Sequence, residues 1–459
     1  MDEQRLLQLS ALEQAELIRS RQVSSVDITK IYLDRIARLD GQLNAFVSVF
    51  DKEALKTAAE VDRKAEAGEP LPLFAGVPTA IKDFNIVAGH TLGVGSRACL
   101  LRWSPVDDLL VRRLRAGGFV FMGKTRMSEF GALPLTISKF FPPAANPWDA
   151  SKNAGGSSGG AGGAVAAGLV PIAHGVDGAG SIRIPSALCH LFGFKPSRGL
   201  IGSGVFLDSP RNIVVDGPMA RDVRDAAAMT DVMSGATRTG ALSMLHASAE
   251  QVRPLKVKVA LKNQLVDPEP AIAAATLRFA KALEERGDTL SDGDMPDINV
   301  DEFLPIWERA IGMFPFVIWP LTEPVSHWLR GRYKRNVGFD YDANQDRVTA
   351  RLQQWFGDAD IWVSPTTPIA APGNKWIDTS APGEEQFRKA APLGAYTAVV
   401  NVLGYPAITI PMGFNAEGMP IGVQVMARHG QDALLFAIAR WAEQKFPWKQ
   451  HWPAGFGPV

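Results

Sequence analysis

The sequence predicts an α/β protein built as one large domain, and two observations support this. Between residues 119 and 193, short apolar runs alternate with segments of helical periodicity, a pattern typical of an α/β sheet. The 459 residues are 46% hydrophobic and 21% charged, which suffices for a large core, and no linker, repeat or low-complexity tail divides them. We therefore predict a single domain, residues 1–459.

The first 70 residues are predicted to be a mostly helical wrap around this core. Ser10 and Glu13 form a capping-box pattern before one amphipathic helix, and a second helix starts at Ser24. Residues 45–50 are typical of a strand, and residues 51–68 of a polar helix.

The predicted catalytic core spans residues 71–235. It begins with an apolar run, residues 73–83, that contains Gly and Pro and ends near Lys82. A helix at 108–116, a buried strand at 119–123 and a helix at 223–233 follow. Further on, strands are predicted at 255–261, 361–364 and 407–410, and helices at 271–286 and 432–444.

Residues 300–342 form a predicted helical segment rich in aromatic side chains. Two interpretations stay open: a helix pair that covers the sheet, or the hydrophobic wall of a substrate pocket. The aromatic residues are Phe303, Trp307, Phe314, Phe316, Trp319, Trp328, Tyr333, Phe339 and Tyr341.

Composition excludes several classes of protein. Lys plus Arg (48) equals Asp plus Glu (48), so no overall field attracts nucleic acid. The two cysteines, Cys99 and Cys189, are too few for a disulfide framework or a cysteine-based zinc site, and H-E-x-x-H is absent. With no signal-peptide pattern and no apolar run long enough to span a bilayer, we predict a cytoplasmic protein without metal, cofactor, nucleic acid or membrane.

Two glycine-dense turns carry serines and are the candidate centre of chemistry. They are residues 154–163, which contain Ser157 and Ser158, and residues 177–183, which contain Ser181. Ser181 follows a turn whose amides, those of Gly178, Ala179, Gly180 and Ser181 itself, could stabilise an oxyanion, although a plain turn would have the same pattern.

Other interpretations of these turns also stay open. Residues 155–159 match G-x-S-x-G, which would make Ser157 the nucleophile of an α/β-hydrolase with His429 as a possible base. A phosphate cradle is the third possibility, but the phosphate-binding glycine motifs are absent from this stretch. Lys82, flanked by apolar residues, could be a desolvated base or a lysine that extends to the surface.

Taken together, these segments resemble the amidase signature family of serine hydrolases. The lysine motif is similar to residues 76–83, the serine- and glycine-rich signature to 146–160, and the nucleophile segment to 177–185. The resemblance continues through residues 193–197, 217–221, 365–368, 401–411 and 418–424, so it covers nearly the whole chain in order.

The resemblance implies a fold in which helices cover both faces of a central mixed sheet. It also implies a catalytic Ser-cisSer-Lys triad. Ser181 matches the nucleophile, Ser157 the bridging serine after a cis peptide bond, and Lys82 the base. Ser158 is expected to be a hydrogen-bond neighbour of Lys82, and Asp177 and Arg183 are assigned to the scaffold. No cofactor is implied.

Three positions depart from the family pattern. Ala179-Gly180 stands where a glycine pair is usual, Val176 replaces a commoner threonine, and residues 140–143 carry an extra aromatic and a proline. These changes affect the expected pocket shape rather than the triad.

The expected function is therefore the hydrolysis of amide C–N bonds in a small molecule with an aryl or bulky apolar acyl group. Carbamates (urethanes) and esters are chemically accessible to the same machinery. The alternatives are the glutaminase subunit of a tRNA-dependent amidotransferase and a non-catalytic or nucleotide-binding protein. Homodimers occur in the family, and the substrate and the oligomeric state are not readable from the sequence.

Overall fold

The centre of the molecule is one twisted, mixed β-sheet. The computed structural model describes residues 1–100, 102–202, 211–236, 243–296, 298–314 and 321–458. In these residues eleven strands pair in the order β1-β3-β2-β6-β8-β7-β12-β13-β11-β9-β10. The strands are β1 (Phe46–Val49), β2 (Pro78–Lys82), β3 (Val120–Thr125), β6 (Ile172–Asp177), β7 (Phe192–Lys195), β8 (Val215–Ala220), β9 (Lys256–Val259), β10 (Thr289–Asp292), β11 (Ile361–Pro365), β12 (Ala407–Phe414) and β13 (Pro420–Ala427).

Parallel and antiparallel pairs share this sheet. β2 is parallel to both β3 and β6, and β9 is parallel to β10 and β11. The middle strands, from β6 through β8, β7, β12 and β13 to β11, pair antiparallel. A separate short hairpin is formed by β4 (Ala145–Asn146) and β5 (Asp149–Asn153).

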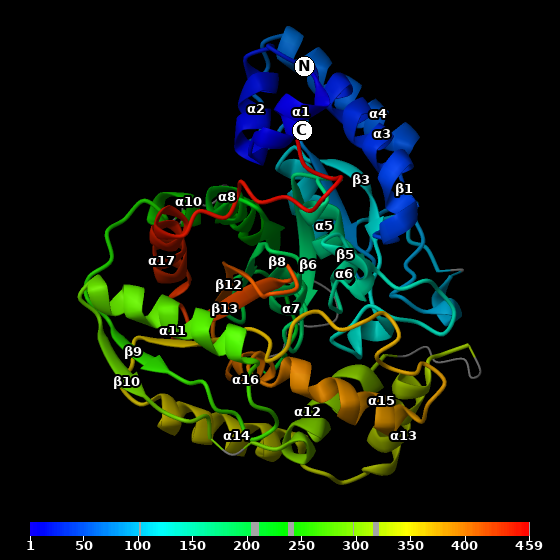
Figure 1. The fold of residues 1–459 in the computed structure, drawn as a ribbon. Coiled ribbons are helices and arrows are strands. Elements are labelled where there is room, and N and C mark those ends of the chain that lie inside the picture. The colour runs from blue at the N-terminus through cyan, green and yellow to red at the C-terminus, as the bar shows by residue number, and fades with distance from the viewer. Residues whose placement is uncertain (101, 203–210, 237–242, 297, 315–320, 459) are drawn as a thin grey trace.

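Helices cover both faces of the sheet (Figure 1). Because side chains alternate along a strand, Ile81 and Phe121 point into the core under one helical layer, while Ala80 and Met122 belong to the opposite core. The first layer contains α5 (Leu109–Ala116), α8 (Val223–Ser234), α10 (Met244–Ala247), α11 (Pro270–Glu285) and α17 (Asp432–Lys445), and the other contains α6 (Gly159–Ala166) and α7 (Arg183–Leu188).

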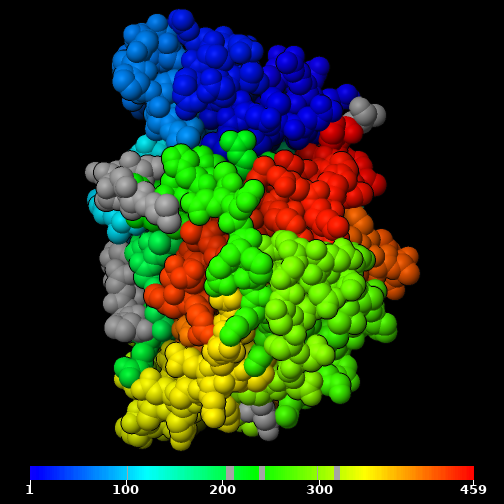
Figure 2. All heavy atoms as spheres, turned by 90° about the vertical axis from the view of Figure 1, so that its left-hand side faces the viewer, coloured from blue at the N-terminus to red at the C-terminus, as the bar shows by residue number. Residues whose placement is uncertain are grey.

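The N-terminal helices lie together at one end of the molecule, beside the C-terminal tail (Figures 1 and 2). They are α1 (Glu3–Gln8), α2 (Ala11–Arg19), α3 (Ser25–Leu43) and α4 (Asp51–Glu66). The tail is tied to them where Arg35 Nη2 donates a hydrogen bond to the carbonyl of Phe456 at 2.7 Å. These helices and β1 extend the core over the edge of the sheet.

A second group of helices lies at the opposite end, where Figure 2 shows the yellow residues of α14. These helices enclose a core of their own with Trp362 of β11 and Met426 of β13. They are α12 (Val300–Gly312), α13 (Pro324–Arg335), α14 (Tyr341–Phe356), α15 (Gly383–Ala390) and α16 (Ala398–Leu403); the short helices η1 (Arg97–Cys99), η2 (Glu129–Gly131) and η3 (Ala391–Gly394) complete the fold.

The predicted α/β architecture, a single domain with a mixed sheet and helices on both faces, is confirmed. The caps at Ser10 and Ser24 lie where the sequence places them, because each side chain accepts a backbone N–H of the first helical turn. The helix predicted at 108–116 is α5, and Asp108 is its N-cap. Among the described helices, none is both long and apolar enough to cross a membrane.

Candidate active site

Lys82 is the last residue of β2 and is almost completely buried. Its side chain is 1% exposed, because β2 lies between β3 and β6 in the sheet. The Nζ atom lies 2.7 Å from Ser157 Oγ and donates to the Val176 carbonyl at 3.0 Å. Burial lowers the pKa of Lys82 to about 7, while the carboxylates of Asp177 and Asp216 act in the opposite direction. An amine in this environment can lose its proton near neutral pH and then accept one from Ser157.

Ser157 is held in the first glycine turn, between β5 and α6. The peptide bond between Gly156 and Ser157 is cis, and Ser157 is 2% exposed. A Cβ atom on Gly156 would lie 2.6 Å from the backbone of Leu135, so only glycine permits this approach. The turn is also held by Thr136, whose N–H donates to the Gly155 carbonyl at 2.9 Å.

Ser158 joins the two turns instead of contacting Lys82 directly. Its Oγ donates to the Val176 carbonyl at 3.2 Å, the same oxygen that Lys82 uses. The Ser158 N–H donates to the Ser181 carbonyl at 3.2 Å. Ser158 and Lys82 therefore share an acceptor, whereas the sequence analysis expects a direct hydrogen bond between them. Ser158 also contacts the backbone of the candidate nucleophile, Ser181.

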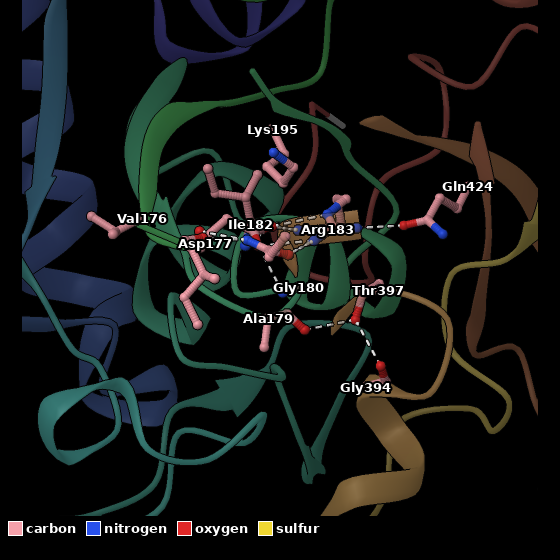
Figure 3. Close-up of polar contacts among 12 residues, drawn as sticks. Val176, Asp177, Ala179, Gly180, Ile182, Arg183, Lys195, Gly394, Thr397 and Gln424 are labelled. Atoms are coloured by element: carbon pink, nitrogen blue, oxygen red, sulfur yellow. Dashed lines mark hydrogen bonds and ion pairs between the residues drawn. The ribbon is translucent and has the colours of Figure 1, made fainter. Parts of the chain in front are cut away.

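Ser181 lies in a tight turn organised by the buried carboxylate of Asp177 (Figure 3). Asp177 accepts hydrogen bonds from the N–H of Gly180 at 2.7 Å and of Ile182 at 3.1 Å. Arg183 adds two more, from Nε at 3.0 Å and Nη2 at 2.9 Å. Burial alone would raise the pKa of Asp177, but the charge and hydrogen bonds of Arg183 hold it well below its ordinary value.

The C-terminal strands and helices complete this scaffold. Arg183 Nη1 donates to Gln424 of β13 at 2.6 Å, and Asn401 of α16 donates to the Asp177 carboxylate at 3.0 Å. Both residues lie inside the segments 401–411 and 418–424 that the sequence analysis selected, but no local signal assigned them this role. Their contacts support the scaffolding role expected for Asp177 and Arg183.

The amides of this turn are not equivalent. The Gly180 N–H is committed to Asp177, which corrects its place among the four oxyanion donors predicted from the sequence. In the described part of the chain, no group accepts a hydrogen bond from the N–H of Gly178, Ala179 or Ser181. These three remain the candidate donors for an oxyanion.

Thr397, just before α16, fixes the peptide between Ala179 and Gly180. Its Oγ1 donates to the Ala179 carbonyl at 2.7 Å (Figure 3). A Cβ atom on Gly180 would lie 2.2 Å from the same hydroxyl, and Gly180 has a φ of 118°. The sequence offered no signal for Thr397, since a lone threonine before a helix is common.

Replacing Thr397 by valine is expected to lower kcat about tenfold with little change in KM. The substitution keeps the volume but removes a hydrogen bond worth about 1 kcal/mol, and the freed Ala179 peptide would misplace the adjacent amides. Steady-state kinetics on a soluble amide measures the effect. Thr397→Ser, which keeps the hydroxyl, serves as the control and should retain most of the activity; equal losses in both variants would contradict the argument.

A cavity opens beside Ser181. Aromatic side chains of α12, Phe303 and Trp307, form one wall, and Phe387 of α15 lines another part. Apart from Ser181 and Asn299, the described residues that line it have apolar side chains or none, and no charged side chain is among them. The cavity therefore suits an apolar group next to the reacting carbonyl.

Trp307 connects this cavity to the turn that bears Ser181. Its Nε1 donates to the Ala132 carbonyl at 3.1 Å, and a Cβ atom on Gly178 would lie 3.2 Å from its ring. The rest of the aromatic segment lies elsewhere: Phe314 packs on Phe130 and Trp328 on Phe387.

Three further aromatic residues of this segment that the structure describes are not among the residues that line the cavity. Tyr333, Phe339 and Tyr341 form a cluster of their own, in which Phe339 is 40% exposed. Phe316 and Trp319 lie outside the described residues.

The other sequence candidates lie apart from this arrangement. His429 is exposed, and its Nε2 contacts the Arg198 carbonyl. Over the residues that the structure describes, no three His, Cys, Asp or Glu side chains come together in a way that could hold a metal ion. The structure brings Lys82, Ser157 and the turn of Ser181 into one buried site.

Known proteins match this chain over nearly its whole length. A family model described as amidase matches residues 27–310 and 326–436. An acylamidase of Rhodococcus erythropolis is 33% identical over 476 residues, which cover 99% of each chain.

Two solved structures also match nearly the whole chain. A 6-aminohexanoate cyclic dimer hydrolase, complexed with its substrate, has a TM-score of 0.88 and 28% identity, covering 98% of this chain and 99% of its own. A bacterial aryl acylamidase of the amidase signature family has a TM-score of 0.85 and 27% identity, covering 97% of this chain and 98% of its own.

Proposed function

Since the chain belongs to the amidase signature family, and is thus a hydrolase of amide C–N bonds, we propose that it cleaves amides of aryl and bulky apolar acids through an acyl-enzyme on Ser181. The observation that carries the proposal is the 2.7 Å contact between Lys82 Nζ and Ser157 Oγ beside the Ser181 turn. It supplies a buried base and a hydroxyl that can pass a proton. The relatives named for acylamide and cyclic-amide hydrolysis agree with this chemistry.

Acylation begins with neutral Lys82. It takes the hydroxyl proton of Ser157, and Ser157 takes that of Ser181 as Ser181 Oγ forms a bond to the carbonyl carbon. The carbonyl π-electrons move to oxygen, where the N–H groups of Gly178, Ala179 and Ser181 stabilise the negative charge. A buried amine whose pKa is about 7 is half deprotonated at neutral pH, close to the optimum for a general base.

Release of the two products follows by the same proton path. When the C–N bond breaks, its electron pair stays on nitrogen, which receives the proton returned from Lys82 through Ser157. Water then attacks the ester on Ser181 while the relay accepts its proton, and the acid leaves as Ser181 regains its hydrogen. Carbamates and esters meet the same requirements, because each has a carbonyl carbon and a protonatable leaving group.

The apolar cavity favours this substrate class over the two alternatives. Free glutamine carries an α-ammonium and an α-carboxylate, and burying either without a partner is costly, yet no charged side chain is among the described residues that line the cavity. A phosphate cradle at the Ser181 turn is opposed by the buried carboxylate of Asp177, which already accepts the Gly180 N–H and so leaves one amide fewer for a phosphate.

The test is a substrate panel on the purified chain, with anilides of benzoate and of a branched aliphatic acid, the matching carbamate and ester, and glutamine. We expect kcat/KM for the apolar amides to exceed that for glutamine by about 100-fold or more, because the cavity leaves the charges of glutamine unpaired. Mass spectrometry after reaction with a fluorophosphonate should find the adduct on Ser181. Preference for glutamine, or an adduct on Ser157, would overturn the proposal.

A further inference from the structure

A buried histidine–carboxylate pair lies directly behind Lys82. His174 of β6 is 0% exposed and Asp216 of β8 is 3% exposed, and His174 Nε2 lies 2.9 Å from Asp216 Oδ1. The two strands pair antiparallel, with Val176 opposite Asp216. The relay described above uses neither side chain.

The other ring nitrogen of His174 faces the backbone of the base. β2 and β6 are paired at two positions, where Thr79 lies opposite Ile172 and Ala80 lies opposite Ala173. Further along β2, the N–H of Lys82 donates to His174 Nδ1 at 3.4 Å. A nitrogen that accepts a hydrogen bond carries no proton of its own, so the imidazole is neutral, its proton is on Nε2, and it donates to Asp216.

Resting on the function proposed above, we propose that His174 and Asp216 are positioning residues for the base. His174 fixes the main chain at Lys82, and its hydrogen bond to Asp216 holds the ring in the orientation that this requires. The negative charge of Asp216 sets the pH range in which Lys82 becomes a base. A purely structural pair would hold the strands together and leave the pH dependence of the reaction unchanged.

The charges around Lys82 support an electrostatic role for Asp216. Asp83, the residue after Lys82, is neutralised by an ion pair with Lys124 of β3 at 2.6 Å. Of the two carboxylates that raise the pKa of Lys82 against burial, Asp177 is bound by Arg183, whereas Asp216 has only the neutral His174 as its hydrogen-bond partner among the described side chains.

Two further titratable groups face this region. Asp108, the cap of α5, is a buried carboxyl whose pKa is raised by burial and, to a smaller extent, by the charge of Asp216. Burial likewise lowers the pKa of Lys195 to about 7, but Lys195 of β7 faces Arg183 and Asp177. Asp216 is therefore the carboxylate at the base whose charge no cation cancels among the described side chains that bond to it.

The test is the pH dependence of kcat/KM for the wild type, Asp216→Asn and His174→Gln on one amide. Asp216→Asn can still accept from His174 but has lost the charge, so the acid limb should move down by about one pH unit from its wild-type midpoint near 7. His174→Gln can still donate to Asp216 but lacks the ring nitrogen that accepts from Lys82. The acid limb of the His174→Gln profile should keep its wild-type midpoint. The plateau value of kcat in this variant should fall about tenfold, because the base is misplaced.

Several outcomes separate this inference from the proposed function. An unmoved limb in Asp216→Asn, or an equal shift in His174→Gln, overturns the electrostatic role. If Lys82→Met keeps wild-type activity, the proposed function fails instead. As a measurement that needs no folded Asp216 variant, ¹⁵N spectra of histidine-labelled wild type at the pH of full activity should show one signal, absent in His174→Gln, with the proton on Nε2 and none on Nδ1; a proton on Nδ1 overturns the inference.

Discussion

Replacing Ser181 by alanine is expected to lower kcat/KM for amides by at least about 10⁴-fold, since the proposed mechanism forms the acyl intermediate on Ser181 Oγ. Ser181 lies at the cavity and is held by the turn in which Asp177 binds Gly180 and Ile182. These contacts involve backbone and Asp177 atoms only, so the variant should fold like the wild type. Steady-state kinetics on the best amide of the panel, with circular dichroism as the check on folding, measures the effect.

Two control variants make this result specific. Ser158→Ala removes a hydroxyl whose hydrogen-bond partners, among the described residues, are the carbonyl and N–H of Val176, so it should cost about tenfold. His429→Ala should be neutral because His429 is exposed and contacts the Arg198 carbonyl. If Ser181→Ala keeps wild-type turnover while His429→Ala abolishes it, the assignment of the nucleophile is wrong.

The second large effect is expected for Lys82→Met, which should lose about 10³-fold in kcat because it removes the base. In the wild type, activity should rise as Lys82 loses its proton, with a midpoint near pH 7, and the variant should lose this limb. Residual turnover should then depend on hydroxide. A wild-type profile that falls between neutral and mildly alkaline pH would contradict the role of Lys82.

The Lys82→Met substitution should change stability in the opposite direction to activity. The pKa of Lys82 is about 7 when folded and about 10.4 in an unfolded chain. Between these values folding releases a proton, so Lys82 makes the protein less stable as pH falls from 10 toward 7. Lys82→Met, which is of similar length and uncharged, should therefore have a Tm at pH 7 that equals or exceeds that of the wild type, as differential scanning calorimetry can test.

Local elements were predictable from sequence because their signals lie within a few residues. The helix that starts at Ser10 has its cap and capping-box partner three residues apart, and the structure contains both hydrogen bonds. The strand predicted at 119–123 differs from β3 by one residue at its start and two at its end, and the helix predicted at 223–233 differs from α8 by one residue at its end only. The order of motifs along the chain likewise predicted the family, since it is a property of sequence alone.

Contacts between distant strands were not predictable in this way. β13 lies between β12 and β11, and only this placement brings Gln424 to Arg183. The hydrogen bond from Ser158 Oγ to the Val176 carbonyl depends on how the first glycine turn packs against β6 after folding. Periodicity along one segment carries no information on which partner a donor finds.

In the aromatic segment at residues 300–342, too, the sequence predicts which side chains share a face of a helix but not what that face contacts. Phe303 and Trp307 occur four residues apart and share one face of α12, which the helical period predicts. Whether that face meets the sheet or a cavity depends on the angle at which α12 packs on the Gly178 turn and on α15. Both interpretations were compatible with the sequence for this reason.

By itself, then, the sequence determined the fold class, the local elements and the three residues proposed for the relay, because turn chemistry and motif order are local properties. The tertiary structure decided which amides stay free beside Ser181, which walls enclose the cavity, and that His174 and Asp216 lie behind Lys82. The physical reason is that burial and hydrogen-bond partners come from residues far apart in the chain. The glycine turns predicted where chemistry would occur, and packing around them decided which groups are free to take part.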